Sequence, residues 1–585
     1  MRRFGLLFLI LGLPGAAAAL ATIGPQANCT YQTGAPNPIQ QALDAGHTDI
    51  RLVGGQSYNG SLMLGGSADV VLRGGYLDCA QALAGTLPGA PQRSIIVATA
   101  ALSAAISIPA AGTRRRSVVV DLIELRPNLE FNPTGAGLVV AGTLDVILRR
   151  SRISGFAYLA GNGGGAIVSQ GLLYLQQSEI SGNSARNGGG LACIDGDVAL
   201  DAASRLLLNA ANGPGPDGGF GGGAWLDGCH FRSEGRVLPS TLGGTSGIIA
   251  NSATRDGGGL FVRGGTVSIS GGPLCALSEA PWCLPRLAIL GANQAGRHGG
   301  ALFATDAADL SIDFAQVSEN QAALSGGAVR LEGGAALRMG GLASLYPSYD
   351  RSHCVEGICE VLIGNRLSVD GLLTGEGGAF SLSDAQLVVA DALMRDHSAL
   401  SGSVIHAAGD SNLLLQQIRV DQRIPAPRVT GASSLLFGDT TEVEIRRSSL
   451  RSDIPDELRL LRLEDSAELR IEDSVVLARG AGMRPLSANF GTTVSGACNA
   501  YAGLTDDAVF EGRVVEPEDF DADGWTPSPT SVLLDQCDAA GLPMSARDIL
   551  GTPRALAQSP ATLSTPMDIG ANERPTPILF GNGFE

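Results

Sequence analysis

The sequence predicts an all-β fold, a right-handed parallel β-helix (a solenoid) that begins with an N-terminal helical cap. Three observations support this prediction. A motif of Asn-x-Ala followed by a glycine pair recurs along the chain, short alternating strands lie between its copies, and helix signals are scarce. Glycine supplies 81 of 585 residues and aromatic residues only 5%, so the chain needs many tight turns and a core of small, stacked side chains.

The chain starts with the pattern of a secretory signal, which we assign to residues 1–21. Two arginines precede a short apolar run, and a stretch rich in small residues follows. An Ala-x-Ala cleavage pattern fits at Ala17–Ala19 or at Ala19–Ala21. The apolar run is shorter than a membrane-spanning helix needs, and we expect no integral membrane span elsewhere.

A short amphipathic pattern over residues 38–44 predicts the helical cap. Its apolar residues can cover the first coil, which otherwise exposes an unpaired strand edge. We expect the β-helix to occupy residues 22–480.

The repeat itself has five clear copies. Their asparagines are Asn183, Asn209, Asn251, Asn293 and Asn320, and the matching glycines are Gly189, Gly219, Gly258, Gly300 and Gly327. The asparagines are spaced by 26 (209 − 183), 42 (251 − 209), 42 (293 − 251) and 27 (320 − 293) residues. A period in the mid-twenties with inserted loops explains these values, and we place insertions near 213–247, 271–286 and 340–360.

The residue types suit stacked coils. Asparagine at a fixed corner can stack on the next coil as a ladder of side-chain amides. Glycine allows positive φ or a close backbone approach, where a Cβ would clash. We therefore interpret the repeat as structural. His397 occupies the asparagine position of a weaker copy, and His298 precedes a glycine pair at a variable position.

The ten cysteines favour disulfides, because an even number follows an export signal and no Cys-x-x-Cys pair occurs. Sequence alone does not give the connectivity. Since a solenoid keeps sequence neighbours close, nearest-neighbour pairing is the attractive arrangement: Cys29–Cys79, Cys193–Cys229, Cys275–Cys283, Cys354–Cys359 and Cys498–Cys537.

Beyond residue 480 the pattern weakens. We assign residues 481–575 to irregular C-terminal rungs and a closing strand, and residues 576–585 to a tail. One motif in this region predicts a metal site: Asp519, Asp521 and Asp523, followed by Gly524, match the oxygen-rich start of a Ca²⁺ loop. The twelfth position is Thr530 instead of Glu, so the loop is incomplete, and an acidic turn is the alternative. No other cofactor is expected.

The Asn-x-Ala and glycine-pair motif resembles the repeats of right-handed parallel β-helix proteins of the pectin-lyase-like superfamily, and most of all those of polymorphic outer membrane proteins. Residues 559–561 (Ser-Pro-Ala) and 568–573 (Asp-Ile-Gly-Ala-Asn-Glu) resemble the segment that closes many bacterial β-helix surface proteins, with Asn572 in place of the usual Tyr. The chain lacks the long series of alternating strands that would form an autotransporter barrel.

The resemblance implies two classes of function. The first is an exported protein, secreted or at the cell surface of a gram-negative-type bacterium, that presents loops to a protein or glycan ligand without catalysis. The second is a polysaccharide lyase or glycoside hydrolase. No catalytic residues can be assigned, because the aspartate, Gly-His-Gly and Arg-Ile-Lys clusters of the hydrolytic members are missing. The net charge of −17 argues against nucleic-acid partners, and an acidic polysaccharide would need local arginines or Ca²⁺.

Overall fold

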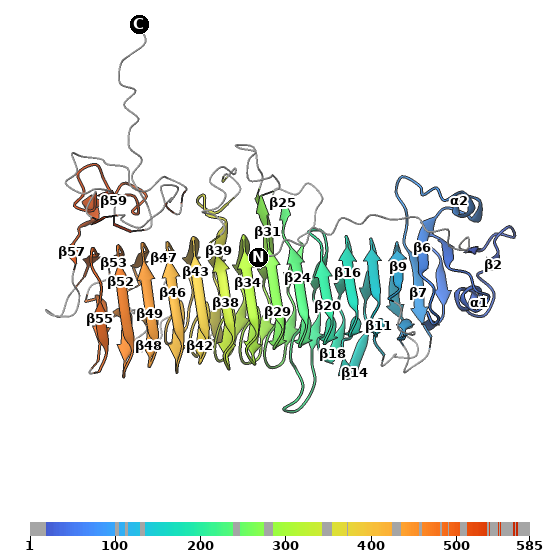
Figure 1. Cartoon of the computed structure of the whole chain (residues 1–585), viewed down its shortest axis with the longest axis horizontal. Helices are drawn as coiled ribbons and strands as arrows, with labels where there is room; N and C mark the ends of the chain where they lie inside the picture. Colours follow the sequence, from blue (N-terminus) through green and yellow to red (C-terminus); the bar gives the residue numbers. More distant parts are fainter. Residues whose placement is uncertain are drawn as a thin grey trace, which may run out of the picture.

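The protein is a long parallel β-helix (Figure 1). The computed structural model describes residues 19–570 except 100–103, 111–114, 129–134, 238–245, 274–284, 342–350, 352–353, 371, 424–433, 455–458, 480–481, 490, 504–511, 535–536, 539–547, 549, 551–565 and 568. Two of its long sheets are parallel throughout. Sheet A has 17 strands, from β1 (Leu20–Gly24) to β55 (Thr493–Ser495), and sheet C has 14, from β5 (Leu62–Met63) to β54 (Arg484–Ala488).

The coils in the middle of the solenoid pass through sheet A, then sheet B, then the shorter eight-stranded sheet D, and then sheet C. Among the described residues, the first and last coils have no strand in sheet D. One complete coil consists of β16 (Leu172–Gln176), β17 (Glu179–Ser181), β18 (Ser184–Asn187) and β19 (Leu191–Ile194). The next coil begins with β20 (Asp197–Leu200), and Leu172 pairs in parallel with Asp197. A coil without insertions therefore takes 25 residues (197 − 172), which confirms the predicted period.

The core lies inside the coils and runs along almost the whole solenoid. In β16, Leu173 and Leu175 are completely buried, whereas their neighbours point outward and are half-buried. The same alternation places one continuous cluster of buried apolar residues from Ala21 to Leu486. No single coil could bury this surface alone, so stability comes from stacking.

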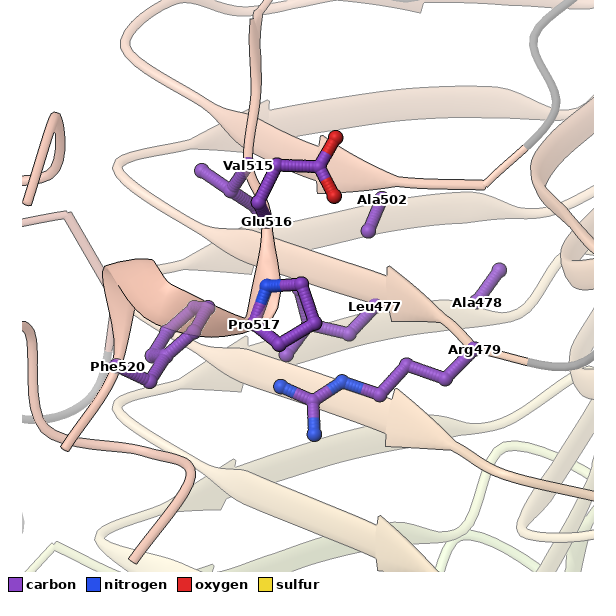
Figure 2. A pocket seen from close by; sticks show the side chains of 8 residues that line it. All are labelled: Leu477, Ala478, Arg479, Ala502, Val515, Glu516, Pro517 and Phe520. Atoms are coloured by element: carbon purple, nitrogen blue, oxygen red, sulfur yellow. The ribbon is translucent and has the colours of Figure 1, made fainter. Parts of the chain in front are cut away.

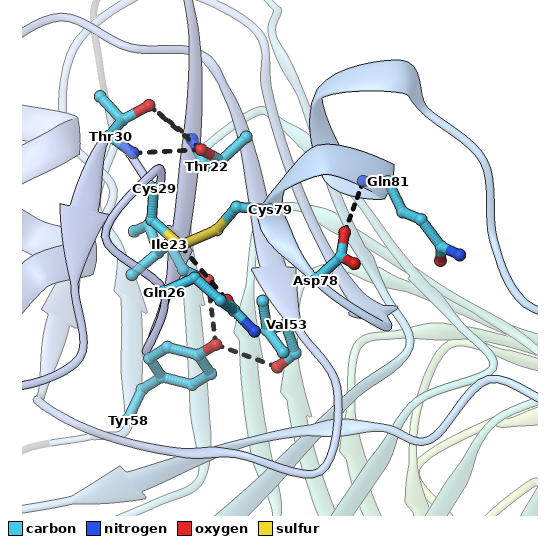
Figure 3. The surroundings of a disulfide bond; sticks show 10 residues. All are labelled: Thr22, Ile23, Gln26, Cys29, Thr30, Val53, Tyr58, Asp78, Cys79 and Gln81. Carbon is cyan, nitrogen blue, oxygen red and sulfur yellow. Dashed lines mark hydrogen bonds between the residues drawn. A yellow bond between two sulfur atoms is a disulfide. The ribbon is translucent and has the colours of Figure 1, made fainter.

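The predicted helical cap is present as α1 (Pro38–Asp44), at the right-hand end of the molecule in Figure 1. Asn37 caps it by accepting a hydrogen bond from the backbone N–H of Gln40 (3.3 Å). Ile39 and Ala42 are fully buried against the first coils. The sequence did not predict the second helix, α2 (Cys79–Ala84), which the Cys29–Cys79 disulfide joins to the segment before α1 (Figure 3).

The predicted boundary at residue 21 cuts through a strand of the first coil. Strand β1 begins at Leu20 and pairs with β3 (Asp49–Val53), so that Ala21 lies opposite Ile50 and is fully buried. The backbone N–H of Thr48 also donates to the Ala19 carbonyl (3.1 Å). Of the two cleavage patterns, the one ending at Ala19 leaves β1 whole. Residues 1–18 lie outside the described residues.

The repeat asparagines form a continuous hydrogen-bonded ladder at the corner between sheets B and D. Each side-chain amide donates to the Oδ1 of the next asparagine along the axis, at 2.9–3.1 Å from Asn183 through Asn209, Asn251, Asn293 and Asn320 to Asn365. The same Oδ1 atoms also accept from the backbone N–H groups. This is the amide stacking predicted from the sequence, and it satisfies buried donors at every step.

The ladder continues with different side chains. The backbone N–H of Asn365 donates to Nδ1 of His397 (3.2 Å), and the N–H of His397 donates to Oε1 of Gln422 (2.8 Å). His397 is thus a corner residue, as its position in the repeat predicted.

The glycine pairs lie at the corner between sheets D and C, and the two glycines of a pair have different structural roles. Gly299 has a φ of +64°, and a Cβ on Gly300 would lie 2.2 Å from the carbonyl oxygen of Gly327 in the next coil. Gly189, Gly258 and Gly327 repeat the second role, with backbone atoms 2.1–2.4 Å from an added Cβ.

The assignment of Gly219 to this corner is wrong. In that coil the backbone N–H groups of Gly188 and Gly189 donate to the carbonyls of Phe220 and Gly221, so the corner pair is Gly221–Gly222. Gly219 lies in the preceding loop, and a Cβ there would meet Thr254 Oγ1.

The insertion assigned to 213–247 is also wrong in part. Its middle forms two strands of the solenoid, β23 (Ala224–Asp227) in sheet C and β24 (His230–Glu234) in sheet A, each paired with the coils on both sides. The extra residues fall before and after these strands. The insertions at 271–286 and 340–360 do separate a strand of sheet A from the following strand of sheet B, although most of their residues lie outside the described ones. The strands are β29 (Thr266–Ser270) and β31 (Pro285–Gly291) for the first, and β38 (Ala336–Gly340) and β39 (Glu360–Ile363) for the second.

Three predicted disulfides are confirmed: Cys29–Cys79, Cys193–Cys229 and Cys354–Cys359. Cys498 is also disulfide-bonded, and its pairing with Cys537 stays a prediction. Cys275 and Cys283 lie outside the described residues. Such bonds are typical of proteins outside the cytosol.

We predict that Asn251→Ala lowers the free energy of unfolding by about 2–4 kcal/mol, because it leaves the buried Asn209 N–H and Nδ2–H groups without their acceptor. Urea denaturation followed by circular dichroism measures this. Gln294→Ala, at an exposed position of sheet D, is the control and should change stability by less than about 0.5 kcal/mol. Equal effects of the two substitutions would contradict a stabilising ladder.

Candidate functional site

The predicted calcium motif forms a turn, and its aspartates do not converge. Asp519 accepts hydrogen bonds from the backbone N–H groups of Glu516 (2.9 Å) and Val532 (3.2 Å). Asp523 accepts from the N–H of Trp525 (2.8 Å) and the Thr526 hydroxyl (2.7 Å). In the part of the chain that the structure describes, no group of three or more His, Cys, Asp or Glu side chains could hold a metal ion. The motif thus gives no support to the calcium hypothesis.

The coils instead bring together a set of polar side chains at the corner between sheets D and C. The residue before each glycine pair stacks along the axis, and His298, Ser325, Glu376 and Ser401 are linked by successive parallel bridges. Arg330 on β37 (Val329–Glu332) and His406 on β45 (Ile405–Ala408) point outward from sheet C beside this row. We call His298, Ser325, Arg330, Glu376 and His406 the corner cluster.

Two pairs within the corner cluster interact directly. Nδ1 of His298 lies 2.6 Å from the Ser325 hydroxyl, and Nδ1 of His406 lies 3.7 Å from Oε2 of Glu376. Arg330 donates to the Ser381 hydroxyl (2.8 Å) and pairs with Glu332 (3.4 Å), and its Nε is buried without a hydrogen-bond partner. Ser325 and His406 are 5% and 6% exposed, whereas the Glu376 side chain is 53% exposed. The cluster is therefore partly desolvated but open on one side.

Both histidines of the cluster are held in the neutral form. Burial lowers the pKa of His298, and Arg297, Arg330 and Arg255 lower it further, while Asp256 opposes them. Burial also lowers the pKa of His406, against the opposing effect of Glu376. A neutral imidazole can accept a proton, so the cluster can supply a general base next to a guanidinium.

Aromatic rings close both ends of the corner cluster. On one side Phe303 stacks on Phe261, with centroids 5.2 Å apart and planes at 3°. On the other side His406 stacks on Phe437, with centroids 4.7 Å apart. Because each ring covers the face of its neighbour, the aromatic row stabilises sheet C and offers a ligand mainly ring edges.

The C-terminal segment covers part of the outer face of sheet B. Phe520, Leu533 and Ile569 of this segment pack on Val475 and Leu477 of β53 (Val475–Ala478). The predicted closing segment thus contacts the solenoid at Ile569, and residues 571–585, which include the predicted tail, lie outside the described residues.

Arginines fill the neighbouring part of this face. The Trp525 ring contacts the guanidinium groups of Arg419 and Arg451, at 4.2 and 4.4 Å from its centroid. Asp421, completely buried, accepts from Arg451 (2.8 Å) and Arg423 (2.8 Å). The ion pairs fix these arginines on sheet B, and the cation–π contacts of Trp525 with Arg419 and Arg451 hold the C-terminal segment against them.

A pocket of about 330 Å³ remains between this segment and sheet B (Figure 2). It is lined by Leu477, Ala478, Arg479, Ala502, Val515, Glu516, Pro517 and Phe520. Six of these eight residues are apolar.

No protein-family model, curated protein or solved structure matches the chain. The site must therefore be interpreted from its own geometry. Among the described residues, no helix is long and apolar enough to cross a membrane.

Sequence reasoning missed the corner cluster. Its members are spread from residue 298 to residue 406, and insertions of different length separate them. One feature of the sequence could have indicated the cluster. His298, Ser325 and Glu376 all occupy the position before a glycine pair, which the sequence alone presents as variable.

We predict that His397→Asn makes the protein less sensitive to acid. Burial lowers the pKa of His397 to about 4, while an unfolded histidine titrates near ~6.5. Between about pH 6.5 and about pH 4 this histidine is protonated in the unfolded chain and neutral in the folded chain. The free energy of unfolding therefore falls as the pH drops through this range. Asparagine keeps the corner and does not titrate. Urea denaturation at a series of pH values checks this, and parallel pH profiles of the two proteins would disprove it.

Proposed function

We propose that the protein is an exported β-helix, secreted or displayed at the cell surface of a gram-negative-type bacterium, that presents loops to a protein or glycan ligand. Three of its insertions carry the proposal, while the extra residues before β23 lie between sheets D and C. Residues 235–246, 271–284 and 341–359 all interrupt the chain between a strand of sheet A and the following strand of sheet B. They therefore leave the solenoid along one edge, where Figure 1 places β25 (Arg236–Val237), β31 and β39.

The described parts of these insertions are tied to one another and to sheet B. Strand β31 pairs antiparallel with both β25 and β30 (Gly272–Pro273). In the third insertion, the Glu356 carboxylate binds Arg395 and Arg419 of sheet B, each at 2.5 Å. Burial alone would raise the pKa of Glu356, but these arginines hold it below its usual value. Anchored loops bind with a smaller loss of conformational entropy than free ones.

Further features support export. The disulfides fit an oxidising compartment, and cleavage after Ala19 would release a chain whose first strand is complete. The Asn-x-Ala and glycine-pair repeat also resembles that of the pectin-lyase-like superfamily, and we include membership in this proposal.

The proposal predicts that the purified chain binds to intact bacterial or host cells or to immobilised glycans without degrading the glycans. Glu356→Gln should weaken this binding several-fold, because the third insertion loses its anchor. Glu472→Gln, in an exposed ion pair with Arg470 on sheet A, is the matched control and should bind normally. Surface plasmon resonance on glycan and cell-envelope surfaces measures both variants. Equal binding by the two variants, or no binding to any surface, would contradict the proposal.

One observation favours a second function, a polysaccharide lyase acting on a uronic acid polymer. In such a reaction a base removes the proton beside the carboxylate and a cation stabilises the resulting charge. A C=C bond then forms as the glycosidic C–O bond breaks, and the leaving oxygen takes a proton from water. The corner cluster offers neutral His298 as the base and Arg330 as the cation. In the tautomer in which Nδ1 of His298 donates to the Ser325 hydroxyl, Nε2 is unprotonated and can take the proton. Arg255 supplies further positive charge nearby, whereas Arg297 is already paired with Asp256 (2.8 Å).

If this second function holds, polygalacturonate or alginate should yield unsaturated products, detectable by ultraviolet absorbance. Arg330→Met and His298→Gln should each reduce the rate at least about 100-fold, as expected for loss of a general base or of charge stabilisation. Arg470→Met, far from the cluster on sheet A, should leave the rate unchanged. Absence of product from both polymers, or full activity of the two cluster variants, would exclude the lyase.

A further inference from the structure

The pocket beneath the C-terminal segment has the composition of a site for a small amphipathic anion. Its floor is apolar: Leu477 and Val515 are 1% and 2% exposed, and Ala478 and Phe520 are also buried. Ligand pockets are typically apolar with a few polar groups that orient the ligand. The volume of about 330 Å³ is at the low end of their range of roughly 300–1,000 Å³, so the ligand must be small.

Arg479 supplies the charge at this pocket. Figure 2 shows its side chain lying along one side of the pocket, with the guanidinium next to Pro517 and Phe520. The guanidinium carbon is 5.8 Å from the centre of the Phe520 ring. Among the described residues, no carboxylate lies within ion-pair distance of Arg479, whereas Arg451 and Arg423 next to it are both paired with Asp421. Arg479 is exposed, so its guanidinium is open to a ligand that enters from solvent.

The surroundings of Arg479 carry charges of both signs. Burial lowers the pKa of Arg479, and the nearby Arg451 and Arg423 lower it further, while Asp453 and Asp421 oppose them. Glu516, the one carboxylate among the lining residues, points away from the guanidinium in Figure 2. An incoming carboxylate would therefore reach a guanidinium that no lining carboxylate pairs with directly.

We infer that this pocket binds a small carboxylate with an apolar body, of the size of a medium-chain fatty acid or an aromatic acid. The carboxylate pairs with Arg479, for which a planar guanidinium is well suited. The apolar body replaces water against Leu477, Val515 and Phe520. The C-terminal segment thereby becomes one wall of a binding site and not merely a covering for sheet B. The inference is independent of the proposed loop-presenting function.

Isothermal titration calorimetry of the full chain with octanoate, benzoate and octanol tests the inference. Octanoate or benzoate should bind, and octanol should bind at least tenfold more weakly than octanoate. Arg479→Met keeps much of the apolar stem but loses the charge, so it should weaken carboxylate binding at least tenfold and leave octanol binding unchanged. Arg470→Met, on the far sheet A, is the matched control and should bind like the unmodified chain.

A second variant tests the pocket itself. Ala502→Leu places a larger side chain in the cavity and should abolish binding of every ligand, while circular dichroism reports whether the fold persists. Three outcomes would overturn the inference: no binding of either carboxylate at millimolar concentration, equal affinity for octanol and octanoate, or unchanged carboxylate binding by Arg479→Met.

Discussion

The close approach of successive coils is the constraint on which the rest of this structure depends. Parallel strands stack about 4.8 Å apart, and the corners must hold this spacing as well as the strands do. At the corner between sheets D and C, the second glycine of each pair leaves no room for a Cβ. At the corner between sheets B and D, the asparagine ladder satisfies the backbone groups that the turn would otherwise bury unpaired. Extra residues are therefore found in the segments that connect one strand to the next, where they do not change the spacing of the coils.

This constraint explains which parts of the fold could be predicted. Asparagine and glycine act locally and recur with the coil, so their pattern predicts the solenoid, and α1 follows from a simple amphipathic pattern. Gly219 was misassigned because glycines at 218–219 and 221–223 compete for one corner, and only pairing between coils distinguishes them. The insertion at 213–247 was misplaced for a related reason. The distance from Asn209 to Asn251 gives the number of extra residues and not their location, and the structure puts β23 and β24 between two shorter additions.

The chemistry was harder to predict than the fold, because it depends on contacts along the axis. His298 and Ser325 are 27 residues apart and bond directly (325 − 298), while Glu376 is 51 residues beyond Ser325 (376 − 325) and occupies the next step of the same row. The number of residues between steps varies with each insertion, so no fixed spacing marks such a cluster. Arg479 and Phe520 meet for a different reason, since the C-terminal segment folds back over sheet B.

The asparagine position and the position before the glycine pair differ in how many residue types the fold accepts there. The asparagine position is buried, and the asparagine side chains bond to the neighbouring coils. The residues that replace asparagine, His397 and Gln422, keep the bond that accepts from the N–H of the preceding coil. The position before the glycine pair lies outside the continuous core and holds Asp256, His298, Ser325 and Glu376 in successive coils. Because the stacking does not depend on those side chains, the solenoid tolerates reactive groups there. A β-helix of this kind can thus acquire a site along its corner without a change in its core, and the corner cluster lies where such a site would be expected.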